Sequence, residues 1–241
     1  MSGQDQTHPT ESSNPHALDH AQDPEELFEV MHPPPSNFDP YNDRPVSTKT
    51  YATRGEVHRQ GMWHCSVHIW IAKASPAPGA SPSFLLLQKR SMNKDTFPGT
   101  WDISSAGHME AGKGSLETAC AELAEELGVV LDMSDNGKGD KQQQDRWKGG
   151  LQYAFTIPAE TKPLGGCNAY EHVYFLIQND TSGSTENFSL GTEEVSEVSW
   201  VPTNEVLNAL RTGDDGYAPR TKEYVAAMTK ELTRILGQDC M

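Results

Sequence analysis

The stretch that decides the fold is GHMEAGKGSLETACAELAEELGVV, residues 107–130. Its second half predicts a helix over Ser115–Leu127, because apolar residues recur at helical spacing. Gly128 follows as a natural C-terminal stop, since glycine readily adopts the left-handed conformation that ends many helices. The apolar side of this helix is formed by Leu116, Cys120, Leu123 and Leu127.

Three glutamates crowd another side of the same helix. Glu122 and Glu126 lie one turn apart with Glu125 beside them, all within a sector of roughly 100°. We therefore expect the helix to bury its leucines and to expose its carboxylates. Like charges four residues apart cost about 0.2–0.5 kcal/mol per pair, which a bound Mg²⁺ would offset. The alternative, an acidic face that contacts only solvent, is common on surface helices, and the spacing leaves both open.

These residues resemble the Nudix box, whose pattern is G-x5-E-x7-R-E-U-x-E-E-x-G-U, with U aliphatic. Gly107 takes the first position without a gap, and the matching later positions are Glu122, Leu123, Glu125, Glu126, Gly128 and Val129. The preceding LLLQKRSMNKDTFPGTWDISSAGH (85–108) looks like the same region of Nudix proteins related to isopentenyl diphosphate isomerase. The resemblance covers roughly residues 26–210 and implies an α/β fold, an α/β/α sandwich around a mixed sheet.

The resemblance implies that Glu122, Glu125 and Glu126 bind Mg²⁺ or Mn²⁺ and take part in catalysis. Two positions depart from the pattern: Lys113 replaces a glutamate and Ala121 replaces an arginine. In the family these two groups hold the metal-binding carboxylates in place, and the nearby Glu110 is a candidate to replace the lost charge. Losing such support typically costs about 10–100-fold in metal affinity or activity, so we expect a weakened site. A binding module without catalysis is the alternative.

Basic and histidine residues beside the motif extend the predicted site. Arg90 and Lys94 match positions that bind a diphosphate in the isomerase branch, and arginine suits phosphate oxygens; the alternative is two ordinary surface cations. His108 and His64 resemble isomerase metal ligands that would suit zinc or manganese. A hydrogen-bonded structural histidine is the alternative for each, and His58 and His68 are weaker candidates, with His68 expected to pack in a strand.

The reaction is predicted to be hydrolysis rather than isomerisation. The isomerase chemistry uses a cysteine just before the motif glycine, where this chain has Ala106, and alanine cannot transfer a proton. Glu171 is the predicted general base, with Glu193 or Glu194 as alternatives, because such a carboxylate needs only to reach the attacking water. The expected substrate is a small-molecule diphosphate of nucleoside or prenyl type; an isomerase-like protein remains the alternative.

Composition narrows the class of partner. The chain has 241 residues and a formal charge of −15, so no basic footprint for nucleic acid or an anionic membrane is present at the whole-chain level. We find neither a signal-peptide pattern nor an apolar run of membrane-spanning length. Four scattered cysteines without CxxC spacing predict a reduced, cytoplasmic protein. Protein partners are not predicted.

The predicted organisation has three parts: a disordered acidic tail over 1–26, a Nudix domain over 27–210 and a helical extension over 211–241 that packs on the domain. A polar insertion is expected over 134–150 and a turn over FPGTWD (97–102). The expected strands include 27–31, 65–72, 83–88, 151–157, 172–178 and 195–202. Two helices are expected after the last strand.

Overall fold

The protein is described by a computed structural model over residues 23–73, 83–94, 96–131, 147–162, 166–179, 185 and 188–236. Most of the predicted tail and of the predicted insertion lies outside these residues. The insertion was predicted too long, because residues 147–150 already belong to strand β7 (Trp147–Glu160). Trp147 is buried and pairs with Gln178 across the sheet, which fixes the start of this strand.

Strands before and after a central helix build an α/β domain, as predicted. The other elements are β1 (Leu27–Met31), β2 (Ser47–Thr53), α1 (Arg54–Gln60), β3 (His64–Lys73), β4 (Phe84–Arg90), β5 (Trp101–Asp102), β6 (Ser105–His108), α2 (Ser115–Leu127), β8 (Asn168–Gln178), β9 (Val195–Pro202), α4 (Thr203–Thr212) and α5 (Lys222–Leu236).

Strand β3 lies at the centre of a mixed sheet with the order β5-β4-β3-β8-β7. It pairs in parallel with β8 and antiparallel with β4 and β6, while β9 pairs with β4. All ten residues of β3 are buried, which explains its apolar run over residues 69–72, because a strand covered on both faces has no solvent side.

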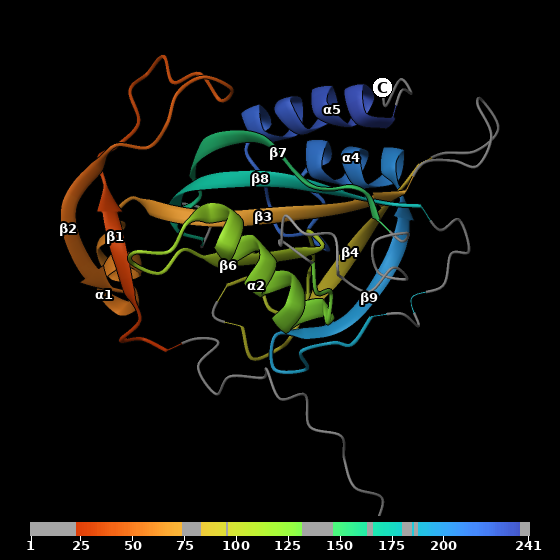
Figure 1. Ribbon diagram of the computed structural model, residues 1–241, viewed down its shortest axis with the longest axis horizontal. Coiled ribbons are helices and arrows are strands. Elements are labelled where there is room, and N and C mark those ends of the chain that lie inside the picture. Colours follow the sequence, from red (N-terminus) through yellow and green to blue (C-terminus); the bar gives the residue numbers. More distant parts are fainter. Residues whose placement is uncertain are drawn as a thin grey trace, which may run out of the picture.

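Helices cover both faces of this sheet (Figure 1). On one face α2 packs Leu123 and Leu127 against Val67, Ile69 and Ile71 of β3. The opposite face carries α4 and α5, which pack against Trp70, Ala72 and the alternate residues of β4 and β8. Side chains along a strand alternate between faces, so β3 supplies both cores. The part of the predicted extension in α5 contributes Tyr224, Met228 and Leu232 to the second core.

A smaller unit closes one end of the sandwich. Strands β1 and β2 pair antiparallel, and α1 packs on them through Phe28, Ala52 and Val57. Thr53 caps α1 in a capping box with Glu56. The sequence did not predict β2, because Ala52 is its one buried residue and the alternation of apolar residues is absent. The predicted turn over 97–102 is shorter than expected, because Trp101 and Asp102 form β5, which pairs with β4.

One buried serine hydroxyl links β3 to β4 at the centre of the sheet. Ser104 is fully buried; its Oγ donates to the Leu86 carbonyl at 2.6 Å and accepts from the Ile71 amide at 2.7 Å. Ser104→Ala should lower the free energy of unfolding by about 1–3 kcal/mol, because two buried backbone groups lose their partner. Urea unfolding measures this loss. Ser196→Ala is the matched control, since its exposed hydroxyl also donates to a β4 carbonyl, that of Lys89; an equal loss in both variants would contradict the expectation.

Candidate active site

The carboxylate of Glu126, near the C-terminal end of α2, is buried where this helix packs on the sheet. The residue is 2% exposed, its Oε2 accepts from the Ala106 amide at 3.0 Å, and Gln88 Nε2 lies 3.3 and 3.4 Å from its two oxygens. Burial raises its pKa to about 7, against an ordinary value of 4.5. The expectation that α2 exposes its carboxylates is therefore wrong for Glu126: the helix lies against β4 and β6, and this residue faces them.

Glu122 fills the space that Gly107 leaves open. A Cβ atom at Gly107 would lie 1.7 Å from Glu122 Oε1, so the first glycine of the motif makes room for this carboxylate. Burial, with the neighbouring charges of Glu126, Glu194 and Glu125, raises the pKa of Glu122 well above its ordinary value. Gly107 thus serves the site through close approach, because any larger residue would displace the carboxylate.

Glu194 and Lys94 complete the acidic cluster. Lys94 Nζ forms an ion pair with Glu194, and both side chains are largely buried. The charge of Glu194 raises the pKa values of Glu122 and Glu126, while the charge of Lys94 lowers them. Glu194, from the turn before β9, therefore lies with the box carboxylates, and the predicted substrate-binding Lys94 lies beside them.

This donor set fits a hard divalent cation. The pKa values of Glu122 and Glu126 are raised because these carboxylates are desolvated and close together, and a divalent cation would stabilise their charged forms. Oxygen donors of this kind are those that Mg²⁺ and Mn²⁺ prefer. Glu122, Glu125 and Glu126 are the residues that would hold the cation.

The two departures from the motif lie at the surface of the site. Lys113 Nζ pairs with Glu110 at 2.9 Å, and both side chains are more than 40% exposed. Glu110 is thus engaged by the lysine that replaces the motif glutamate. Ala121 is half-buried and, as alanine, supplies no charge to hold the carboxylates.

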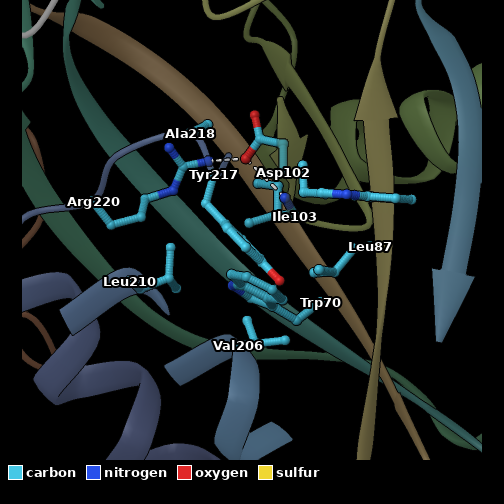
Figure 2. Close-up of a pocket in the computed structure, with 10 residues that line it drawn as sticks. Trp70, Leu87, Asp102, Ile103, Val206, Leu210, Tyr217, Ala218 and Arg220 are labelled. Atoms are coloured by element: carbon cyan, nitrogen blue, oxygen red, sulfur yellow. Dashed lines mark hydrogen bonds and ion pairs between the residues drawn. The ribbon is translucent and has the colours of Figure 1, made fainter. Parts of the chain in front are cut away.

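Arg90 is committed to a structural network. Its Nε and Nη2 donate to Thr96 and its Nη1 pairs with Asp102 at 3.1 Å. Asp102 also pairs with Arg220, and Figure 2 shows this pair at one end of a pocket lined by Trp70 and other apolar side chains. The two guanidinium groups hold the pKa of Asp102 below its ordinary value despite burial, which raises it. A diphosphate-binding role for Arg90 remains a prediction, since its guanidinium already has these partners.

Glu171 lies on the face of the sheet opposite to the box glutamates. Along β8 it alternates with Val173 and Phe175, which belong to the core under α4 and α5. Its Oε2 is 3.7 Å from Nδ1 of His68, and burial raises its pKa to about 8. The predicted packing residue His68 is thus part of a buried polar network with Tyr224, 3.2 Å away. The role of Glu171 as general base remains a prediction.

His108 is brought together with three residues that lie far apart in the sequence. The candidate ligand atoms of His58, His64, His108 and Cys167 all lie within 4.8 Å of one another. This group contains none of the box glutamates. Gly107 faces Glu122, so the next residue along β6, His108, points to the other face of the sheet.

The structure brings together residues that the sequence did not connect. His58 was a weak candidate, and the cysteines carry no metal-binding spacing, because strand register rather than sequence distance brings Cys167 to His108. Asp102 and Arg220 were not predicted as a pair. Glu194 was among the predicted alternatives for the general base, as an acidic residue just before the last strand.

A comparison with known families decides the identity of this fold. A model of the NUDIX domain matches residues 71–223. The chain belongs to the Nudix family. It is 38% identical over 186 residues to Nudix hydrolase 3 of Arabidopsis thaliana, which covers 76% of this chain and 21% of that protein. The chain therefore spans about a fifth of that relative.

Other relatives match over most of their length. An uncharacterized Nudix hydrolase of Listeria innocua is 30% identical over 173 residues, covering 72% of this chain and 82% of the relative. An isopentenyl-diphosphate Delta-isomerase of Jannaschia is 24% identical over 164 residues, covering 68% of this chain and 78% of that protein. A crystallised Deinococcus radiodurans protein shares the fold with a TM-score of 0.53 at 17% identity, covering 83% of this chain and 98% of that one. The Nudix assignment, with its isomerase-like branch, is confirmed.

Among the described residues, no helix is long and apolar enough to cross a membrane.

The buried carboxylate of Glu126 predicts a pH dependence of stability. The folded chain holds this proton up to a pKa of about 7, whereas the unfolded chain releases it near 4.5, so the free energy of unfolding falls as pH rises between these values. One pKa unit corresponds to about 1.4 kcal/mol, so the loss is on the order of 2–3 kcal/mol. Urea unfolding in EDTA at pH 5 and pH 8 measures this loss of stability. Glu126→Gln should remove the part of the loss that comes from Glu126.

The control for this experiment is Glu117→Gln, an exposed residue on the same helix, which should keep the wild-type pH dependence. Glu171 contributes a change of the same sign to every variant and cancels in the comparison. An undiminished pH dependence in Glu126→Gln would show that another group holds the proton.

Proposed function

We propose that this Nudix protein is a metal-dependent hydrolase that cleaves a diphosphate linked to an organic group of nucleoside or prenyl type. The observation that carries the proposal is the buried carboxylate pair, Glu126 held by the Ala106 amide and Glu122 seated against Gly107. Desolvating two neighbouring carboxylates costs stability, and a ligand that binds them accounts for their placement. Mg²⁺ or Mn²⁺ is the proposed cofactor, and the cytoplasm the proposed location.

The residues around the cluster have distinct proposed roles. A bound cation would neutralise the diphosphate and lower the pKa of a water molecule. Glu122, Glu125 and Glu126 hold the cation. Lys94, at the edge of the cluster, binds a diphosphate oxygen once the substrate competes for its pairing with Glu194.

Glu194 is the better-placed general base of the predicted candidates. Its carboxylate lies close enough to Glu122 and Glu126 to raise their pKa values, and it is separate from the polar network that holds Glu171. When Lys94 turns to the substrate, Glu194 is released to accept a proton from the attacking water.

A binding role without catalysis is the second candidate. The observation that favours it is the loss of the motif's orienting charges: Lys113 is paired with Glu110 at the surface, and Ala121 has no polar group. In that case the same cluster would bind a cation and a diphosphate without hydrolysing it.

The first test removes a proposed metal ligand. Glu126→Gln should lower hydrolysis by about 100-fold or more, because losing groups that merely support ligands already costs about 10–100-fold. Phosphate release from a panel of nucleoside and prenyl diphosphates, with Mg²⁺ or Mn²⁺, measures the activity. Glu117→Gln on the exposed side of α2 should retain wild-type turnover. Equal turnover in Glu126→Gln and wild type would exclude this cluster as the active site.

The second test restores the motif. The double variant Lys113→Glu, Ala121→Arg should raise hydrolysis by about 10–100-fold if the protein is an enzyme with a weakened site. The same assay panel measures the gain, and Lys89→Glu, an unrelated charge reversal, is the control. No gain over the whole panel would favour the binding role instead.

A further inference from the structure

We propose that Gln88 is a positioning residue of the carboxylate cluster, and that its side-chain amide holds Glu126 in the role that an arginine has at position 121 of the motif. Gln88 lies in β4, outside the Nudix box, and the sequence did not predict it as part of the site. The inference rests on the proposed function, because Glu126 is one of the proposed ligands of the cation.

The Gln88 amide reaches both carboxylate oxygens of Glu126. Its Nε2 lies 3.4 Å from Oε1 and 3.3 Å from Oε2. A donor at nearly equal distances from two oxygens is shared between them, and each bond is then longer than a single hydrogen bond. The Ala106 amide donates to Oε2 at 3.0 Å. The carboxylate is therefore held from β4 and from β6, which restrains its rotation.

The amide itself has a fixed place on the sheet. Gln88 is 2% exposed, and its backbone lies between Asp102 of β5 and Val198 of β9. Its side chain points to the same face as that of Leu86, which belongs to the core under α2, because alternate residues of a strand share a face. A strand paired on both edges gives the donor a rigid base beneath the helix.

The contacts of Glu126 leave room for a cation. An ionised carboxylate offers about four lone-pair sites on its two oxygens. The Gln88 amide and the Ala106 amide make three contacts with them. At least one site is left for a divalent ion, and the two amides fix the direction in which it points.

A neutral donor suits this position. Ala121 brings no polar group to the cluster, so the orienting contact has to come from elsewhere in the chain. An amide does not repel a divalent cation as a guanidinium does, and its burial costs less than that of a charged group. Gln88 therefore orients Glu126 from the sheet, where the motif would orient its carboxylates from the helix.

The first experiment removes the donor and measures cation binding without any substrate. Gln88→Met keeps the length of the side chain but has no N–H group. The metal-free full chain is titrated with Mn²⁺, and the free ion is measured by electron paramagnetic resonance. Gln88→Met should weaken Mn²⁺ binding by about 10–100-fold, the usual effect of losing a group that supports a metal ligand.

The matched control is Gln178→Met. Gln178 is also a buried glutamine of the central sheet, and its backbone pairs with Lys73 of β3 and Trp147 of β7, outside the carboxylate cluster. This variant should bind Mn²⁺ as wild type does. Gln88→Asn is the second variant in case Gln88→Met folds poorly. It keeps a polar amide but withdraws the donor by one methylene group, so it should also weaken Mn²⁺ binding.

A second-site variant tests the replacement of the motif arginine. Ala121→Arg should raise Mn²⁺ affinity by a larger factor in Gln88→Met than in the otherwise wild-type chain, because the arginine then supplies a missing donor. Residues that share one role are expected to be non-additive in this way. An equal factor in both chains would overturn the replacement, since the two groups would then act independently.

The outcomes separate this inference from the proposed function. If wild type binds Mn²⁺ and Glu126→Gln loses it, while folded Gln88→Met and Gln88→Asn retain wild-type affinity, the inference is overturned and the proposed function stands. If wild type does not bind Mn²⁺, both are overturned. Near-ultraviolet circular dichroism shows whether each variant is folded.

Discussion

The alternation of side chains along strand β3 is the constraint on which the carboxylate cluster and the His/Cys group both depend. Because β3 is buried on both faces and pairs with β4, β6 and β8, its neighbours must alternate in step with it. Gly107 and His108, adjacent in β6, are sent to opposite faces by this alternation. The glycine receives a glutamate of α2 on one side, and the histidine joins the His/Cys group on the other. One pair of residues thus separates the carboxylate cluster from the group formed by His58, His64, His108 and Cys167.

The carboxylate cluster combines structural and chemical roles. Glu126 satisfies a backbone amide of β6, so it helps dock α2 on the sheet, yet its burial raises the free energy of its charged form. A protein that needed only the docking could use a neutral amide side chain. A buried glutamate at this point costs free energy, and such costs are typical of functional sites. The neighbouring carboxylates of Glu122 and Glu194 increase this cost by charge repulsion.

The face of the sheet under α4 and α5 carries buried charges of its own. Asp102, Arg220 and Arg90 form a buried ion-pair network, and Glu171 lies close by with a raised pKa. Alanine in place of the isomerase cysteine supports our proposal of phosphorus chemistry at the carboxylate cluster over carbon chemistry. The relatives named as isomerases share the fold at low identity, which fits a common scaffold with different sites.

The sequence by itself determined the α/β class, the bounds of α2 and the three box glutamates, because a long gap-free motif and helical periodicity are local signals. It missed β2, whose residues are mostly exposed, and it misjudged the exposure of Glu126, since periodicity cannot say which side of a helix meets the sheet. Only the tertiary structure assembled His58, His64, His108 and Cys167. Parallel pairing of β3 with β8 brings together residues about a hundred positions apart, and no spacing in the sequence encodes that register.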